Sequence, residues 1–454
     1  MFLFRPALRS FRAVSRIATR LSSTSAEGPY KDISVGPDEK LHVGKLTFVE
    51  EPLGLPAKEH FGWPHLEFNE SIGPDNRYVI SRKLGWGMPS STWLARDKIE
   101  NSYVALKILN GHHTSLVEQN LVWELKILER VSSPSPHCLD LMSHFTFPGK
   151  GQRRTAPLPR HQGPRRRRKT TVLETRRGVV HTDVKHDNIF FDTPLSTDHF
   201  DALVASDPPR RHPPEASHDG LLVQAAVSQP LPLPTLQEAM QLNFLLADFG
   251  SAQPLFIQTQ NEISAPQLRP PEIMIGGPWD VKVDIWAFGC LIFELITGRG
   301  LFKYEPDLRY NLDEPNFMLY QMICYTGEDF RAEQLSVSPL AAQFFDSTCN
   351  LKANPPLFDY PFETSIRSYK VVEEADVLST AAFMRRCLCL DPTKRASAAE
   401  LLSDPWFDGV EWGRSTESCD QANVLLLPSS DDHRTRQTSA SIGSQGILLA
   451  QHQL

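Results

Sequence analysis

The stretch "HTDVKHDNIFFD" at residues 181–192 sets two carboxylates, an amine and an amide within six positions, directly before an apolar run. Asp183 could accept a proton from a hydroxyl group, Lys185 could steady a transferring anionic group, and Asn188 could hold a metal ion. An isolated cluster of this kind is also compatible with a polar turn. Its meaning therefore depends on what else the chain provides.

A glycine turn lies about a hundred residues earlier. The sequence "RYVISRKLGWGMPSSTWLA" at 77–95 alternates like a strand that enters a turn and leaves it as a second strand. Gly85 and Gly87 would let backbone amides approach phosphate groups closely. Ser90 occupies the third glycine position of the GxGxxG spacing, and Pro89 lacks an N–H. By itself this loop is only a weak indication of phosphate binding.

Lys107 lies in the middle of the apolar strand "VALKIL", where an unpaired ammonium group would be costly. The next segment, 115–131, has the apolar spacing of an amphipathic helix and offers Glu118 and Glu124 as partners. We expect the pair to form with Glu124. An isolated lysine of this kind could also lie on a solvated strand face.

The fourth piece is "ADFGSAQ", in which Asp248 would bridge a metal ion to nucleotide phosphates. Phosphoryl transfer depends mainly on positioning and charge neutralisation. The four pieces supply both, and they occur in one order along the chain. Together they predict a phosphotransferase.

These motifs resemble those of the eukaryotic protein kinases. The segment "LRPPE" (268–272) is similar to the end of their activation segment, with Glu272 as its last acid. The segment "DIWAFGC" (284–290) resembles the central helix of their larger lobe, and the resemblance implies that Asp284 anchors the catalytic-loop backbone. It also implies that Arg395 is the buried partner of Glu272.

The implied fold is α+β and bilobal, with a small β-rich N-lobe and a larger helical C-lobe. The expected organisation is a mitochondrial transit peptide at 1–26, an irregular extension at 27–77, a kinase domain at 78–408 and a disordered tail at 409–454. Within the domain we expect an N-lobe at 78–147, a degenerate basic segment at 148–178, and a C-lobe at 179–408 that carries a flexible insertion at 193–240.

Within that superfamily, "RYVISRKLGWG", "STWLARD", "HTDVKHDNI" and "FMLYQMICYTGE" most resemble SR-protein kinases of the fungal type. This resemblance implies a non-specific serine/threonine protein kinase that acts on basic or Arg/Ser-rich proteins, as a monomer. Lys185, two positions after the catalytic Asp183, favours Ser/Thr over Tyr. Thr182 replaces the arginine of many kinases, so no activation-loop phosphate is needed to neutralise a cation there. The implied cofactors are ATP and Mg²⁺, and the implied cofactor-binding residues are Gly85, Gly87, Ser90, Thr92, Ala105 and Lys107.

The basic segment 148–178 departs from this pattern. It holds eleven Lys and Arg residues against Glu174 alone, where a kinase needs another strand, the adenine-contacting hinge and a buried helix. Three explanations stay open: a mis-spliced or frame-shifted stretch, a kinase with little activity, or a basic insertion over a rebuilt hinge. The corresponding alternative function is a catalytically impaired pseudokinase or scaffold. The segment lacks interleaved aromatic residues, which argues against a nucleic-acid-binding role.

Composition argues against a membrane-spanning protein and against a structural zinc site. No apolar run reaches the length of a membrane-spanning helix, and the seven cysteines form no CxxC pairs. The net charge is −7 although residues 1–26 hold five arginines and no acid, so the rest of the chain outside 148–178 is acidic and suits basic partners. The arginine-rich leader at 1–26 predicts import into mitochondria. The family resemblance instead implies localisation in the cytoplasm or nucleus.

Overall fold

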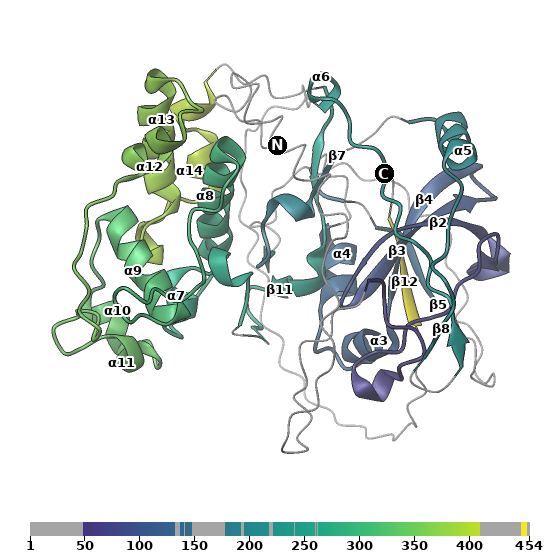
Figure 1. The fold of residues 1–454 in the computed structure, drawn as a ribbon, viewed down its shortest axis with the longest axis horizontal. Coiled ribbons are helices and arrows are strands. Elements are labelled where there is room, and N and C mark those ends of the chain that lie inside the picture. The colour runs from purple at the N-terminus through teal and green to yellow at the C-terminus, as the bar shows by residue number, and fades with distance from the viewer. Residues whose placement is uncertain are drawn as a thin grey trace, which may run out of the picture.

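The computed structural model describes residues 49–451 except 132–136, 140, 148–177, 192–194, 218–220, 240, 259, 261 and 409–445. A strand-rich lobe and a helical lobe lie side by side (Figure 1), as the bilobal prediction requires. The predicted transit peptide, nearly all of the basic segment and most of the tail lie outside the described residues.

The N-lobe is built on one antiparallel sheet. Its strand order is β1-β2-β3-β4-β12-β5. The strands are β1 (Ser71–Ile72), β2 (Tyr78–Gly87), β3 (Ser90–Asp97), β4 (Ser102–Leu109), β5 (Leu141–Phe147) and β12 (Gly446–Gln451). The predicted strands over 78–109 are therefore confirmed. The sheet also extends into the region that we expected to be irregular, because β1 pairs with the start of β2.

The prediction of a disordered tail is wrong for residues 446–451. They form β12, which lies between β4 and β5 (Figure 1). Polar composition dominates the preceding sequence, but 447–450 is a run of four apolar residues, which is typical of a strand enclosed in a sheet.

The single amphipathic helix predicted over 115–131 is also wrong. Two helices replace it, α3 (Gly111–Glu118) and α4 (Glu124–Val131). Asn120 between them has a left-handed backbone with φ of 59°, which an α-helix cannot contain. The break starts a new helix at Glu124 and so places that carboxylate in a first helical turn.

The segment 193–240 is not the flexible insertion that we expected. It contains α5 (Thr197–Ser206), β8 (Glu215–Ala216), β9 (Leu222–Val223) and α6 (Leu236–Ala239). The buried Arg82 of β2 donates to the carbonyl oxygens of Gln229 and Pro230 at 2.8 and 2.9 Å. Amino-acid composition could not predict that this segment is ordered. The segment is held by its backbone carbonyl oxygens, which accept hydrogen bonds from the buried guanidinium group of the sheet.

Two short antiparallel ladders flank the catalytic loop. They pair β7 (Ile189–Phe191) with β10 (Phe244–Leu246) and β6 (Val179–Val180) with β11 (Gln253–Pro254). The single turns of 3₁₀-helix are η1 (Ala57–Glu59), η2 (Pro74–Asn76), η4 (His186–Asn188), η5 (Phe249–Ser251), η6 (Pro266–Leu268), η7 (Pro392–Lys394) and η8 (Pro405–Phe407).

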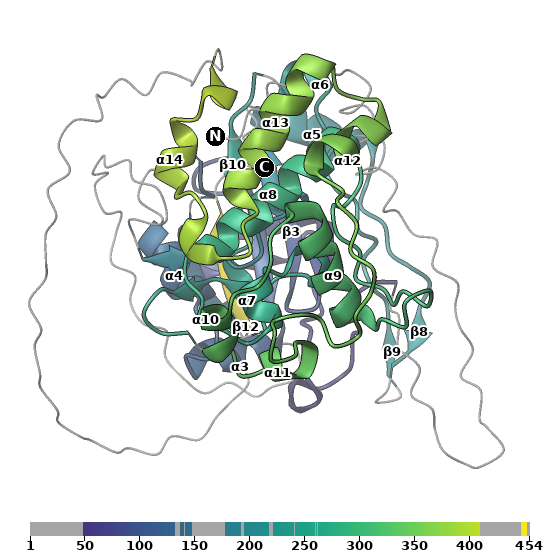
Figure 2. The same ribbon diagram turned by 90° about the vertical axis from the view of Figure 1, so that its left-hand side faces the viewer.

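The C-lobe surrounds one buried helix, α8 (Lys282–Thr297), as the sequence predicts. Its other helices are α7 (Pro271–Met274), α9 (Glu314–Thr326), α10 (Ala332–Ser336), α11 (Ala341–Phe344), α12 (Phe362–Tyr369), α13 (Glu374–Cys387) and α14 (Ala398–Leu402). Figure 2 shows α9, α12 and α13 around α8, and α12 and α13 both contact it. No helix in the described part is long and apolar enough to cross a membrane.

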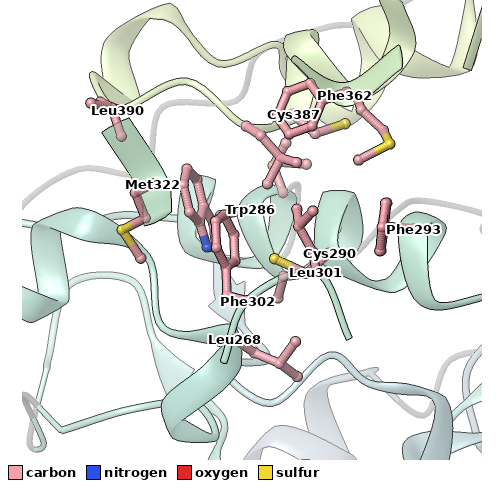
Figure 3. Packing of buried hydrophobic residues seen from close by; sticks show 14 of the residues in the cluster. Leu268, Trp286, Cys290, Phe293, Leu301, Phe302, Met322, Phe362, Cys387 and Leu390 are labelled. Atoms are coloured by element: carbon pink, nitrogen blue, oxygen red, sulfur yellow. The ribbon is translucent and has the colours of Figure 1, made fainter. Parts of the chain in front are cut away.

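Aromatic side chains fill the C-lobe core. Trp286 of α8 stacks on Phe302 with ring centroids 5.5 Å apart, and both are buried (Figure 3). Burial of each such side chain contributes roughly 1.5–3 kcal/mol. At Gly289 a Cβ would approach Cγ of Leu388 to 2.7 Å, so glycine is needed for the close contact of α8 with the residues that follow α13. This core provides a rigid base for the catalytic loop.

Candidate active site

Lys107 of β4 connects the two lobes. Its Nζ contacts Oε1 of Glu124 on α4 and lies 2.8 Å from Oδ1 of Asp248, which precedes η5. Lys107 and Glu124 are buried, whereas 46% of the Asp248 side chain is exposed. The sequence singled out these three residues, and the structure brings them together. The partly exposed carboxylate of Asp248 thus lies beside the ammonium group of Lys107, which Glu124 holds in place.

Electrostatics favour the charged forms of Lys107 and Asp248. Burial alone would lower the pKa of Lys107, but the adjacent carboxylates of Glu124 and Asp248 outweigh burial and raise it. The ammonium of Lys107 lowers the pKa of Asp248 to about 2 against the opposing effect of burial. Burial raises the pKa of Glu124, and Lys107 opposes that rise. A Lys107–Asp248 pair that is charged at neutral pH follows.

Gly250 keeps space open next to these charges. A Cβ at this position would lie 3.2 Å from Oδ1 of Asp248 and 3.8 Å from Nζ of Lys107. Asp248 itself has a left-handed backbone, with φ of 58° and ψ of 69°, which is uncommon for a residue with a side chain. Its Oδ1 also accepts a long hydrogen bond from the Gly250 N–H at 3.4 Å. The backbone of this turn therefore directs the carboxylate toward Lys107.

The catalytic-loop residues form a second cluster. Lys185 Nζ lies 2.8 Å from Oδ2 of Asp183. Asn188 donates through Nδ2 to the same carboxylate oxygen at 2.9 Å and to the Asp183 carbonyl oxygen at 2.8 Å. These contacts fix the Asp183 side chain while leaving it partly exposed.

Asp284 at the start of α8 anchors the backbone of the catalytic loop. Its two carboxylate oxygens each accept a backbone N–H at 2.7 Å, one from His181 and one from Thr182. Thr182 is left-handed, with φ of 64°, an outlier for a β-branched residue. Its hydroxyl donates to the Ser251 carbonyl, and its own carbonyl accepts from the Ser264 hydroxyl at 2.7 Å. The left-handed turn at Thr182 is thus held by hydrogen bonds to two points of the 248–272 segment, Ser251 and Ser264.

The two clusters are adjacent because their strands pair. Ile189, which follows Asn188, lies opposite Leu246 in the β7–β10 ladder. The Ala247 N–H then donates to the Asn188 carbonyl at 2.9 Å. This pairing sets Asn188 and Asp248 at the same end of one ladder, although 60 positions separate them in the sequence.

His181 is a site residue that sequence reasoning did not single out. Its ring is buried between Phe249, at a centroid distance of 5.0 Å, and the backbone. Nδ1 accepts from the Asp183 N–H at 3.3 Å, so Nε2 is the donor to the Ala247 carbonyl at 2.9 Å. One imidazole therefore connects the backbone beside Asp183 to the backbone beside Asp248. Its place directly before the catalytic loop was the only signal in the sequence.

The glycine loop is the hairpin between β2 and β3. Gly85 lies opposite Thr92, Gly87 lies opposite Ser90, and Thr92 lies opposite Lys107 on the next strand. Of the predicted cofactor residues, Ser90 and Thr92 therefore lie on the strand next to that of Lys107, and Gly85 and Gly87 lie one strand further away. Ala105 lies on β4 itself, two positions before Lys107. No heavy atom comes within 4 Å of a Cβ built at Gly85, which leaves open space above the loop.

Asn110, at the end of β4, ties down the tip of the glycine loop and was missed from the sequence. Its Nδ2 donates to the Met88 carbonyl and its N–H to the Pro89 carbonyl, both at 3.0 Å. Its Oδ1 accepts from the His113 N–H and caps α3. Asparagine before a helix is a capping signal, but capping does not indicate contact with a loop 22 residues earlier.

The structural pair expected in the C-lobe is present. Both guanidinium Nη atoms of Arg395 lie 2.6 Å from the two carboxylate oxygens of Glu272. Both side chains are buried, and Arg395 also donates to the carbonyl oxygens of Cys389 and Lys282. This bidentate pair locks the end of the 248–272 segment onto the C-lobe.

The donor set at Asn188 and Asp248 fits a divalent cation. The amide nitrogen of Asn188 is engaged by Asp183, so its Oδ1 is the atom available for a cation, and Asp248 is ionised. Carboxylate and amide oxygens are ligands that Mg²⁺ and Ca²⁺ accept. Within the described ranges no group of three His, Cys, Asp or Glu residues forms a metal cage. Any cation at this site would need further ligands, such as phosphate oxygens.

Comparison with known proteins agrees with this geometry. The protein kinase domain model matches residues 174–407. The chain is 25% identical over 386 residues to serine/threonine-protein kinase SRPK of Physarum polycephalum, covering 74% of this chain and 87% of the relative. It is 33% identical over 162 residues to serine/threonine-protein kinase SKY1 of Saccharomyces cerevisiae, but this match covers only 36% of this chain and 21% of the yeast protein. It is 30% identical over 174 residues to mouse SRSF protein kinase 3, covering 38% and 30% of the two chains. This chain belongs to the protein kinase domain family.

Proposed function

We propose that the chain is a serine/threonine protein kinase of the SR-protein-kinase type, which transfers the terminal phosphate of Mg-ATP to serine or threonine hydroxyls in proteins. The observation that carries this proposal is the position of Lys107. One buried amine contacts a buried glutamate and the partly exposed Asp248. Placing these three charged side chains together away from water costs stability, which a scaffold that never binds nucleotide would have no reason to bear.

Each side chain has a defined task in this mechanism. Asp183 accepts the proton of the attacking hydroxyl, and Lys185 beside it steadies the transferring phosphoryl group. Lys107 positions the nucleotide phosphates. Asn188 and Asp248 would hold Mg²⁺, which neutralises phosphate charge when it is bound. Thr92 and Ala105 would lie along the adenine, and Gly85, Gly87 and Ser90 would face the phosphates.

The substrate class follows from similarity and charge. Relatives are named as SRPK and SRSF protein kinases. The chain carries a net charge of −7 despite its two basic stretches, so the rest of the chain is acidic, which suits an arginine-rich substrate. Lys185, two positions after Asp183, supports Ser/Thr specificity. We infer that Arg/Ser repeats in splicing factors are the preferred acceptors.

A phosphate-transfer assay tests the proposal. The full chain is incubated with radiolabelled Mg-ATP and three peptides that differ at one residue type: Arg-Ser repeats, Lys-Ser repeats and Arg-Tyr repeats. We expect label on Arg-Ser repeats, less on Lys-Ser repeats, and none on Arg-Tyr repeats. Asp183→Asn provides the inactive control, with a rate lower by about 10²–10⁴-fold. Equal labelling by the wild type and Asp183→Asn would support the pseudokinase alternative instead.

A further inference from the structure

The N-lobe sheet contains a slot that a distant segment fills. Strand β12 pairs with β4 on one edge and with β5 on the other. Among the described residues, β12 is the only strand partner of β5, and no ladder joins β5 directly to β4. Residues 446–451 therefore connect β5 to the rest of the sheet, although they come after the whole C-lobe in the sequence.

This slot adjoins the nucleotide site. In the β12–β4 ladder Leu449 lies directly opposite Lys107, and Gln451 lies opposite Ala105. The other edge of β4 pairs with β3, where Thr92 lies opposite Lys107. Lys107 is thus carried by a strand whose two edges are satisfied by different parts of the chain. Loss of β12 would turn the strand of Lys107 into an edge strand.

An open slot would be unfavourable for physical reasons. The facing edges of β4 and β5 would each present unpaired backbone N–H and C=O groups. Every β4 residue from Val104 to Leu109 is buried in the sheet that contains β12, so an empty slot would expose this mostly apolar strand as well as leave its edge unpaired. Buried backbone groups without partners are rare in folded proteins. The slot therefore needs an occupant whenever the lobe is ordered.

We propose that docking of residues 446–451 between β4 and β5 is a positioning element of the nucleotide site: the docked strand orders β4, and with it Lys107. The occupant is the chain's own segment, because an extended connection over 409–445 can span about 120 Å, so the segment reaches the slot from the end of the C-lobe. Intramolecular tethering gives it a high effective concentration. The consequence for nucleotide binding rests on the proposed function.

Hydrogen exchange tests the docking itself. Three proteins are compared: the full chain, a truncation that removes 446–454, and a control truncation that removes only 452–454. In the first truncation we expect amides of β4 and β5 to exchange at least about tenfold faster, while α8 stays protected. The control truncation should match the full chain. A synthetic peptide of residues 444–454 should restore protection when it is added.

Equal protection of β4 and β5 in all three proteins would overturn the proposal. Should the truncation fail to fold, Ala450→Pro in the full chain addresses the same question. Both edges of β12 are paired, so proline removes a ladder hydrogen bond at whichever edge its N–H faces. Leu426→Pro, outside the strand, is the matched control. Faster exchange of β4 and β5 in Ala450→Pro alone supports the proposal, and no difference between the two variants contradicts it.

Nucleotide affinity then separates this proposal from the proposed function. We expect the truncation at 446 to bind Mg-ATP at least about tenfold more weakly than the control truncation, because Lys107 is less well ordered. Unchanged affinity would contradict the positioning role even where exchange confirms docking. If no protein, including the full chain, bound Mg-ATP, the proposed function would fail while the exchange data still decided the role of β12 in the sheet.

Discussion

The ammonium nitrogen of Lys107 lies 2.8 Å from Oδ1 of Asp248, although 141 positions separate the two residues in the sequence. Lys107 belongs to the N-lobe sheet, and Asp248 follows a strand that pairs with the catalytic loop. Their contact joins the two lobes at the site where we propose that a nucleotide binds. Glu124 completes the contact from α4.

Replacing Lys107 should abolish transfer and also destabilise the fold. Lys107→Met removes the charge that we propose positions the nucleotide phosphates, and we expect a turnover number lower by about 10²–10³-fold. It also leaves the fully buried carboxylate of Glu124 without its cation, which costs about 3–5 kcal/mol of unfolding free energy. Chemical denaturation measures this second effect.

The double variant Lys107→Met/Glu124→Gln provides the control. Because Gln carries no charge, the double variant should recover part of the stability lost in Lys107→Met while remaining inactive. A double variant less stable than Lys107→Met would show that the buried carboxylate is not the source of the loss.

The Glu272–Arg395 pair should be far more important for stability than an exposed pair of the same kind. Arg395→Ala leaves a buried glutamate unpaired, and we expect a loss of about 3–5 kcal/mol. Arg367 forms a similar pair with Glu374, but both side chains are exposed and screened by solvent, so Arg367→Ala should have a much smaller effect than Arg395→Ala. Equal losses in urea denaturation would refute the distinction.

Acid should weaken the Lys107–Asp248 pair within a defined range. Lys107 lowers the pKa of Asp248 from its ordinary 3.8 to about 2, so the folded state binds this proton less readily than the unfolded state. The stabilisation is fully present above about pH 4 and is lost as the pH falls toward 2. We expect the stability difference between wild type and Asp248→Asn to shrink as the pH falls from 5 to 3. A difference independent of pH would contradict this assignment.

Turnover should not depend on phosphorylation of the 248–272 segment. Thr182 carries no charge that a phosphate must neutralise, and its hydrogen bonds to Ser251 and Ser264 already hold the segment. We expect the same turnover number before and after phosphatase treatment. Thr182→Val, which removes only the hydroxyl, should lower turnover by weakening this anchor. Loss of turnover in the phosphatase-treated wild type would show that a phosphate is required.

Residues with strong local chemistry could be predicted from the sequence. Lys107 in an apolar strand demands a carboxylate, and the spacing of Asp183, Lys185 and Asn188 demands one shared loop. Backbone contacts between distant segments could not be predicted. The carbonyls of Gln229 and Pro230 that satisfy Arg82 carry no side-chain signature. Nor does the pairing of residues 446–451 with β4, because strand partners far apart in sequence leave no local pattern.

The site's auxiliary residues were missed for a related reason. Asn110 and His181 act through hydrogen bonds to backbone atoms of other segments. From its residue type and position, Asn110 suggests only a helix cap and His181 only a core histidine. Neither suggestion includes the hydrogen bond to a distant backbone carbonyl. The mitochondrial leader at 1–26 stays a prediction that fusion of residues 1–30 to a fluorescent reporter can test.

Calorimetric titration with Mg-ATP tests the central claim, that Lys107 and Asp248 hold a nucleotide between the lobes, most directly. We predict saturable binding to the wild type that weakens by at least about tenfold in Asp248→Asn and when Mg²⁺ is replaced by a chelator. Absence of binding to the folded wild-type chain, or equal affinity in Asp248→Asn, would contradict the account.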